Sequence, residues 1–193
     1  MSEHEKLIAH VKTIVPITGD EADKLITHFK VHALGKKEHL LRSGEVSHHM
    51  RFIVSGCLRA YYIDDQAEEH TLQFGIEGWW INDLYSYLTQ TAARQFIQAT
   101  EPSTILQIHR SSLDQLFNES QMIERFFRLK MQKAYVALQE RTLHQLSLNA
   151  KERYLHFRNH YREIEQKVPQ YMVASYLGIT PEFLSELRKK IND

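Results

Sequence analysis

The stretch from residue 168 to 190, VPQYMVASYLGITPEFLSELRKK, restricts the fold of this chain more than any other. Its apolar residues recur at positions that seal two short helices against each other, with a small residue where the helices cross. The apolar positions are Val173, Leu177, Ile179, Leu184 and Leu187, and the small residue is Ala174. This spacing predicts a helix-turn-helix, for which the alternative is an ordinary helical hairpin packed on a core.

The residue types between these two helices mark the turn. Gly178 follows the first helix, where a residue without Cβ takes the left-handed conformation that ends a helix. Thr180, Pro181 and Glu182 suit the N-cap and the first two positions of the next helix, because they supply a hydroxyl acceptor, a preset φ and a carboxylate at the positive helix end. The second helix therefore has a well-marked start.

A helix-turn-helix inserts the N-terminal part of its second helix into the major groove of double-stranded DNA. Residues in that part meet base edges or nearby phosphates, and basic residues further along contact the backbone as point charges. The predicted DNA contacts are Gln170, Tyr171, Thr180, Pro181, Glu182, Ser185, Glu186, Arg188 and Lys189.

Two parts of the sequence resemble the Crp/Fnr family of transcription regulators. AKERYLHF and VPQYMVASYLGITPEFLSELRKKI are similar to the DNA-binding domain of that family, and RFIVSGCLRAYYIDD and GWWINDLYSYLT resemble its effector-binding barrel. The resemblance implies a homodimer that binds a palindromic site, an unknown effector in the barrel, and RNA polymerase as a further partner. It divides the chain into a cyclic nucleotide-binding-like sensor domain over 1–120, a dimerisation helix over 121–146 and a helix-turn-helix domain over 147–193.

Short β-type runs fill the sequence from Val31 to about His109. Turn residues such as Gly44, Gly56 and Pro102 separate them, and the runs are KVHALGKKEHLL, MRFIVSGCLRAYYI, EEHTLQF, FIQAT and TILQIHR. Many short strands at this spacing are typical of a small antiparallel β-barrel or jelly roll. Because helical patterns stand on both sides of the strands, the expected fold class is α+β.

Shorter helices are expected before and after the barrel. Residues 2–15 form an amphipathic pattern, and a second helix is expected to end at Phe29 with Asp20 as its cap. After the strands, Ser111 or Ser112 is expected to cap a short helix with the sequence LDQLF.

A long helix is predicted from about residue 121 to 146, where neither Gly nor Pro occurs. Its apolar residues advance by four, four, three and four positions, which keeps one stripe on one side of the helix. The stripe consists of Ile123, Phe127, Met131, Ala134 and Leu138. Phe126 and Leu129 widen the apolar surface, so we expect the helix to serve both the barrel and a two-fold partner. The alternative is a helix packed only on its own barrel.

The predicted effector pocket departs from that of family members that bind cyclic AMP. Those members carry a Gly-Glu pair at the ribose and an Arg followed by Ser or Thr at the phosphate, whereas this chain has Asn82-Asp83 and Ala93-Arg94-Gln95. Losing a charge-assisted partner in a buried site costs about 1.5 to 3 kcal/mol, so cyclic nucleotide binding is disfavoured and no cofactor is expected. The predicted pocket residues are Trp80, Asn82, Asp83, Leu84, Arg94 and Gln95.

Aromatic residues gather near this pocket, at Trp79, Trp80, Tyr85 and Tyr87. Aromatic side chains in such a place more often fill a core than bind a ligand. If a ligand binds among them, an apolar or planar molecule suits them better than a phosphate.

Composition limits both the DNA affinity and the cellular location. The 193 residues include 24 basic and 24 acidic ones, and positions 147–193 hold eight Lys or Arg against six Asp or Glu, a net charge of +2. One copy should bind DNA weakly, which favours a dimer. The single cysteine, Cys57, allows neither an intramolecular disulfide nor a four-cysteine iron-sulfur cluster. No run approaches about 18 apolar residues, so we expect a cytoplasmic protein without membrane contact.

Neither a metal site nor an enzyme is expected. His48 and His49 are adjacent, and no carboxylate or thiol follows at ligand spacing. His156 and His160 lie four apart on an expected helix and suit a solvated surface. A metal-dependent cupin enzyme is the rival that a barrel raises, but its His-X-His motif is absent. The sequence also lacks a nucleophile and base constellation and a glycine-rich phosphate loop.

Two features of the C-terminal stretch depart from the family pattern. Family members commonly place Arg after the serine of the second helix, where this chain has Glu186, four residues after Glu182. Two such carboxylates repel each other and face a polyanion, although Glu can accept from cytosine N4. The printed sequence ends at Asp193, so we expect the β-hairpin wing to be reduced or absent. The alternative function is therefore a ligand-binding signalling module of the same fold with a weak, degenerate DNA-binding domain.

Overall fold

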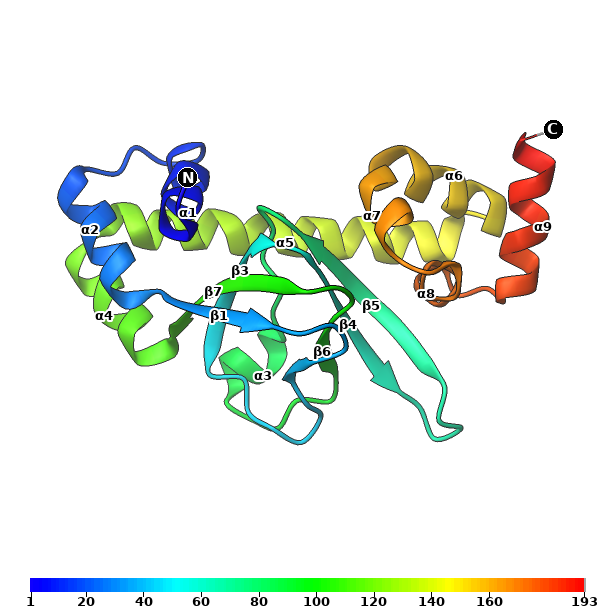
Figure 1. The fold of residues 1–193 in the computed structure, drawn as a ribbon, viewed down its shortest axis with the longest axis horizontal. Helices are drawn as coiled ribbons and strands as arrows, with labels where there is room; N and C mark the ends of the chain where they lie inside the picture. The colour runs from blue at the N-terminus through cyan, green and yellow to red at the C-terminus, as the bar shows by residue number, and fades with distance from the viewer. Residues whose placement is uncertain (193) are drawn as a thin grey trace.

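The computed structural model describes residues 1–192 as a β-barrel between two groups of helices (Figure 1). The long helix α5 (Gln121–Ser147) runs beside the barrel and joins the two groups. The helices at one end are α1 (Glu3–Lys12), α2 (Gly19–His28) and α4 (Arg110–Glu119), and those at the other end are α6 (Ala150–His160), α7 (Arg162–Lys167), α8 (Gln170–Leu177) and α9 (Pro181–Asn192). The predicted α+β class is confirmed.

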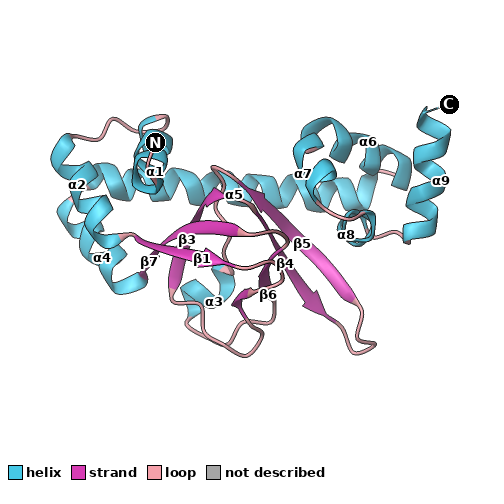
Figure 2. Cartoon of the chain, in the orientation of Figure 1, coloured by secondary structure: helices cyan, strands magenta, loops and turns pink. Residues whose placement is uncertain are grey.

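Two antiparallel sheets form the barrel, with strand orders β1-β7-β3 and β2-β6-β4-β5 (Figure 2). The elements are β1 (Lys30–Leu34), β2 (His39–Leu41), β3 (His49–Ser55), β4 (Cys57–Ile63), β5 (Glu69–Ile76), α3 (Leu84–Thr89), β6 (Phe96–Ala99) and β7 (Ser103–His109). Apolar side chains from both sheets, including Ile53, Leu58 and Ile105, are fully buried together. The barrel is thus a filled sandwich, and β5 is an edge strand.

The N-terminal helices cover the outer face of the three-stranded sheet. Phe52 and Leu106 of that sheet share a buried cluster with Leu7 of α1, Leu25 of α2 and Phe126 of α5. This second core fixes the beginning of α5 against the barrel, since its side chains are withdrawn from water on all sides.

Both predicted caps in this region are wrong by a few residues. Thr18 caps α2 and Asp20 lies inside the helix, because a capping box needs Glu or Gln three residues after the cap. Glu21 stands there for Thr18, whereas Asp23 stands there for Asp20. His109 caps α4 through its ring nitrogen, which accepts from the backbone N–H of Ser111, so Ser111 and Ser112 are helical.

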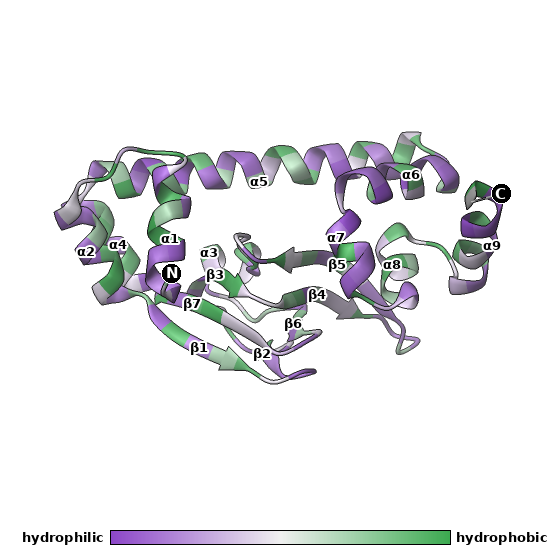
Figure 3. Ribbon diagram, turned by 45° about the horizontal axis from the view of Figure 1, so that its top comes forward, coloured by the Kyte–Doolittle hydropathy of each residue, from purple (hydrophilic) through white to green (hydrophobic). Residues whose placement is uncertain are grey.

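The long helix α5 confirms the prediction from the gap in Gly and Pro. Ser120 caps it, accepting from the backbone N–H of Ile123 at 3.2 Å, and the Ser120 hydroxyl also donates to Glu21 of α2. Apolar residues recur along its whole length (Figure 3), but only Ile123, Phe126 and Phe127 are buried. Beyond its first turns, α5 therefore presents much of its apolar surface to solvent.

The C-terminal domain, defined as α6 to α9, packs on the barrel. Phe74 and Ile76 of β5 lie in one buried cluster with Tyr154 and Phe157 of α6 and Ala174 of α8. The rings of Phe74 and Tyr176 have centroids 5.5 Å apart. Burial of these aromatic surfaces holds the domain against the edge strand.

Hydrogen bonds seal the same contact, which we call the β5 seam. The Ser175 hydroxyl of α8 accepts from the backbone N–H of Thr71 at 2.8 Å and donates to the carbonyl of Glu69 at 2.7 Å. Arg141 of α5 donates to the carbonyl of Thr71 at 3.2 Å and lies 4.2 Å above the ring of Tyr176. Barrel, long helix and C-terminal domain thus meet at one strand edge.

Among residues 1–192, no helix combines the length and the hydropathy that crossing a bilayer requires.

Gly56 offers a test of the barrel turn between β3 and β4. It has φ +94°, and a Cβ there would lie 2.2 Å from the Ser103 hydroxyl oxygen, whereas Gly44, at φ +93°, has open space. We expect Gly44→Ala to cost about 1 to 3 kcal/mol from backbone strain, and Gly56→Ala to cost about 1 to 3 kcal/mol more from overpacking. Urea unfolding of both variants measures the difference, and equal losses would contradict the packing described here.

Removing the Ser175 hydroxyl tests the β5 seam. Ser175→Ala leaves the N–H of Thr71 and the carbonyl of Glu69 without their protein partner. We expect a loss of about 1 kcal/mol at the seam, and hence exchange of the Thr71 amide with solvent deuterium about five- to tenfold faster. Thr27→Ala is the matched control, because it removes a hydroxyl bonded to the Asp23 carbonyl within α2. Unchanged Thr71 exchange in Ser175→Ala would show that the hydroxyl does not hold the seam.

Candidate DNA interface and effector site

The two predicted helices of the helix-turn-helix are α8 and α9, and they pack as their spacing predicts. Ala174 is fully buried at their crossing, and Val173, Leu177 and Leu184 are buried around it. Gly178 ends α8 in the left-handed conformation, with φ 67° and ψ 41°. The short turn therefore closes as the sequence predicts, with the glycine at the one position that needs positive φ.

The start of α9 is fixed by Thr180. Its hydroxyl accepts from the backbone N–H of Phe183 at 3.2 Å, and Pro181 is the first residue of the helix. The first turn of α9 is exposed to solvent, and α9 lies at the end of the molecule opposite α2 (Figure 1).

The residues predicted to contact DNA form an accessible surface. All of them are exposed except Arg188, which is half-buried; the exposed ones are Gln170, Tyr171, Thr180, Pro181, Glu182, Ser185, Glu186 and Lys189. No ion pair joins Glu182 or Glu186 to a lysine within the described residues. Both carboxylates thus stay free for an external donor.

One further residue of α9 belongs to this surface, since Phe183 is 44% exposed. Lys190, which the sequence predicts to contact the DNA backbone with Arg188 and Lys189, is exposed as well. An exposed phenylalanine in the first turn offers an apolar contact of the kind that thymine methyl groups receive. The sequence pattern missed Phe183 because an aromatic residue next to Leu184 resembles a core position.

The stripe predicted for dimerisation divides in the structure. Ile123 and Phe127 are buried within the same chain and Met131 packs against that core, whereas Ala134 and Leu138 are exposed. The prediction is therefore wrong for Ile123 and Phe127, because the stripe combined two uses of one helix. The exposed apolar side chains of α5 are Tyr135, Val136, Leu138, Leu143 and Leu146.

A cavity of about 480 Å³ lies where the barrel, α5 and the C-terminal domain meet. Three of the predicted pocket residues, Asn82, Leu84 and Gln95, line it. Its apolar walls include Trp79, Phe157 and Tyr176. Its volume falls in the range of small-molecule sites.

Trp80 does not line this cavity. It packs among Phe29, Phe52 and Phe127, with ring centroids 5.3 to 6.1 Å away, and its indole N–H donates to His10 at 3.4 Å. The indole belongs to the core below the N-terminal helices, so the pocket role predicted for it is corrected to a packing role.

Asp83 and Arg94 also fall outside the cavity. Asp83 is 3% exposed, and its carboxylate accepts from the backbone N–H of Ser86 as the cap of α3, so local structure already uses it. Arg94 is exposed to solvent. The donors that would converge on a ribose and a phosphate are thus not assembled here.

A buried arginine of the chain lies beside Asp83. Arg51 is 3% exposed and donates to the Ser47 hydroxyl at 3.0 Å and to the His49 carbonyl at 3.2 Å. Burial lowers the pKa of Arg51 to about 10, and the negative charges of Asp83 and Glu45 oppose that shift. The negative charge of Asp83 therefore stabilises the charged guanidinium of Arg51.

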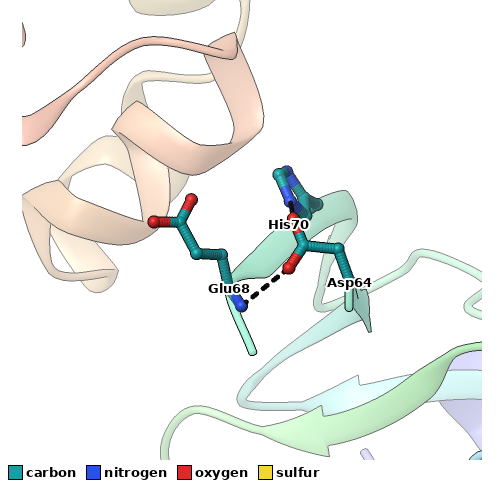
Figure 4. A group of neighbouring side chains, drawn as sticks. All are labelled: Asp64, Glu68 and His70. Atoms are coloured by element: carbon teal, nitrogen blue, oxygen red, sulfur yellow. Dashed lines mark hydrogen bonds and ion pairs between the residues drawn. The ribbon is translucent and has the colours of Figure 1, made fainter. Parts of the chain in front are cut away.

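One group of side chains in the described residues has metal-ligand geometry: Asp64, Glu68 and His70 at the β4–β5 hairpin (Figure 4). Asp64 accepts from the backbone N–H groups of Gln66 and Glu68 at 2.9 and 3.0 Å and pairs with His70 at 2.7 Å. Both carboxylate oxygens of Asp64 thus close the hairpin, which accounts for the cluster without an ion.

The histidines of α6 stack on one another at the cavity edge. His156 and His160 have ring centroids 4.1 Å apart, and His144 of α5 lies 4.3 Å from His156. Burial, followed by the neighbouring His160 and His144, lowers the pKa of His156. The three rings therefore form a contact between α5 and α6 that favours the neutral form of His156.

Comparison with known proteins agrees with this geometry. Residues 31–120 match the family model of the cyclic nucleotide-binding domain. A curated relative, the anaerobic regulatory protein of Haemophilus influenzae, is 25% identical over 181 residues, which cover 87% of this chain and 68% of the relative.

Solved structures of bacterial regulators share the fold. FixK2 from Bradyrhizobium japonicum has a TM-score of 0.71 at 16% identity, covering 85% of this chain and 84% of that one. A regulator from Eubacterium rectale, described as a member of the Crp/Fnr family, has a TM-score of 0.69 at 14% identity, covering 91% and 84%. Residues 31–120 thus match a cyclic nucleotide-binding domain, and with its C-terminal helix-turn-helix the chain as a whole is similar to transcription regulators of the Crp/Fnr family.

Proposed function

We propose that this protein is a homodimeric, cytoplasmic regulator that reads a palindromic DNA site with α9 of each protomer and responds to a small molecule in its sensor. The observation that carries this proposal is the exposed first half of α9, fixed by the Gly178 turn and the Thr180 cap. A helix presented this way suits the major groove. The proposed role is regulatory rather than catalytic, and RNA polymerase is a further proposed partner at a promoter.

Within the proposed interface, the residues of α9 divide into two roles. Glu182 stands in the first turn, where its carboxylate can accept from cytosine N4. Lys189 and Lys190 in the last turns supply point charges for phosphates, which position the helix without reading sequence. Gln170 and Tyr171 are exposed at the start of α8 and add contacts to the DNA backbone.

The exposed apolar residues of α5 support the proposed dimer. Tyr135 is 62% exposed, Leu138 61% and Leu146 81%, and these residues follow one another at near-helical spacing. Single exposed apolar residues are ordinary, but a row along one helix is typical of a helix that packs on a partner. A second copy of α5 would cover this row and place two α9 helices on one DNA molecule.

Regulation is proposed to act through the β5 seam. DNA recognition by a dimer requires half-sites about 34 Å apart, so a small movement of each C-terminal domain changes the fit. A ligand that binds one position of that domain better than another shifts the balance between them. The seam is a suitable element because it joins sensor, α5 and α8.

Glu182→Ala tests base reading. We expect the wild-type protein to enrich a palindromic sequence from random DNA fragments, and the variant to lose discrimination at one cytosine in each half-site by about fivefold or more, since such a contact contributes about 1 to 3 kcal/mol. Lys189→Ala is the matched contrast: it should weaken binding to all sequences alike and lower the salt dependence by about one charge per protomer.

Glu3→Ala, which removes an exposed carboxylate of α1, is the neutral control for this experiment. Enrichment of no sequence by the wild-type protein at low salt would refute the proposal. That result would favour the alternative, a ligand-binding signalling module whose two exposed carboxylates on α9 disable DNA binding.

Charge placed on α5 tests the dimer. Tyr135→Glu and Leu146→Glu should yield folded monomers by light scattering, because each buries a carboxylate at the proposed contact. Phe127→Glu should instead destabilise each protomer, because Phe127 is 3% exposed in the chain's own core. Urea unfolding separates the two effects. If both exposed-position variants remain dimeric, the row on α5 is not the contact.

A further inference from the structure

The cavity at the three-way junction is bordered by two arginines from different elements. Arg141 projects from α5 and Arg153 from α6, and both line the cavity. His144 and His156 also border it, and Glu140 is the one acidic residue among its lining residues. The lining therefore carries more positive than negative charge, although the whole chain is neutral.

Arg141 has no carboxylate partner within the described residues. It donates through one nitrogen, Nη2, to the carbonyls of Thr71 at 3.2 Å and Tyr176 at 3.5 Å. Its remaining N–H groups have no protein acceptor in the described part of the chain, and burial lowers its pKa. A guanidinium withdrawn from water is stabilised strongly by an anion and only weakly by carbonyl groups.

Arg153 also has no carboxylate partner within the described residues. Its Nε donates to the Leu177 carbonyl at 3.3 Å and its Nη1 to the Leu148 carbonyl at 2.8 Å. None of the ion pairs found in residues 1–192 includes Arg153 or Arg141. Two guanidinium groups thus border one cavity while donating only to backbone carbonyls.

The other walls of the cavity are apolar and flat. Phe74 of β5, Trp79, Phe157 of α6 and Tyr176 of α8 supply aromatic surface, and Ala134 and Leu138 of α5 supply aliphatic surface. Aromatic walls favour a planar apolar molecule through area burial and stacking. The apolar walls therefore suit the apolar body of a ligand, and the two arginines suit an anionic group on the same ligand.

We propose that this cavity binds a small organic anion, in which a planar apolar body lies among the aromatic walls and a carboxylate or sulfonate meets Arg141 and Arg153. This inference rests on the proposed function, because it names the chemical class of the effector. It also moves ligand recognition away from Asp83 and Arg94, neither of which lines the cavity.

The position of the two arginines connects ligand binding to the C-terminal domain. Arg141 bonds the barrel through Thr71 and the C-terminal domain through Tyr176, while Arg153 bonds Leu177 at the end of α8. An anion that competes for these donors changes the contacts that seat α8 on β5. Ligand binding and the position of α9 are thereby linked through the hydrogen bonds of Arg141 and Arg153.

Fluorescence titration of the full-length protein with anilinonaphthalene sulfonate tests the proposal. N-phenylnaphthylamine, which has the same rings without the sulfonate, is the matched neutral probe. We expect saturable binding of the sulfonate at one site per chain with a Kd at least about tenfold lower than that of the neutral probe, since a charge-assisted contact contributes about 1.5 to 3 kcal/mol. Equal affinities for the two probes would overturn the proposal.

Variants then locate the charge. Arg153→Gln and Arg141→Gln should each weaken sulfonate binding about tenfold or more while leaving the neutral probe unchanged, and the exposed Arg94→Gln should change neither. Arg141→Lys keeps the charge at that position and covers the case in which Arg141→Gln unfolds. Because the charge is kept, Arg141→Lys should retain most of the sulfonate affinity. Sulfonate affinity that is unchanged in Arg153→Gln, or that falls in Arg94→Gln, would refute the inference.

The DNA experiments are independent of this titration. Charge-dependent probe binding without any selected DNA sequence would leave the ligand site standing and refute the DNA-reading function. Selected DNA binding without charge-dependent probe binding would refute the ligand site alone.

Discussion

The packing of the first turns of α5 into the chain's own core is the constraint on which the rest of the molecule depends. Ile123, Phe126 and Phe127 are buried with the N-terminal helices and the three-stranded sheet, so the direction of α5 is fixed where it leaves the sensor. With neither Gly nor Pro as far as Ser147, the helix carries that direction to the other end of the molecule. The position of the C-terminal domain follows from this anchored helix together with the β5 seam.

Local sequence rules were sufficient to predict features of the backbone that depend on a single residue, such as a turn or a helix cap. Gly178 and Thr180 predict the turn and the start of α9 because each satisfies a requirement of its own backbone. The apolar stripe on α5 was less informative, because helical periodicity does not distinguish residues that pack in the chain's own core from residues on an exposed face of the helix. Ile123 faces the core of its own chain, whereas Tyr135 is exposed, and only the packed structure separates the two.

The sensor shows why a family resemblance predicts its fold better than its ligand. The barrel needs buried apolar residues at alternating positions, and those are present. A ligand site needs donors at particular places, and here Asp83 caps α3 beside the buried Arg51 while Arg94 faces solvent. The sequence places Asp83 and Arg94 near the pocket, but it does not show that Asp83 caps α3 and lies beside Arg51, which belongs to the separate strand β3.

The β5 seam affects whether the protein associates with itself in solution. A strand at the border of a sheet offers unpaired amides and carbonyls that can recruit strands from other molecules. Ser175 occupies the Thr71 amide and the Glu69 carbonyl, so α8 acts as a cover for that border while it is docked. Any conformation in which the C-terminal domain moves away from the barrel exposes the edge of β5. In that conformation the protein avoids self-association only while another segment or molecule covers the exposed edge.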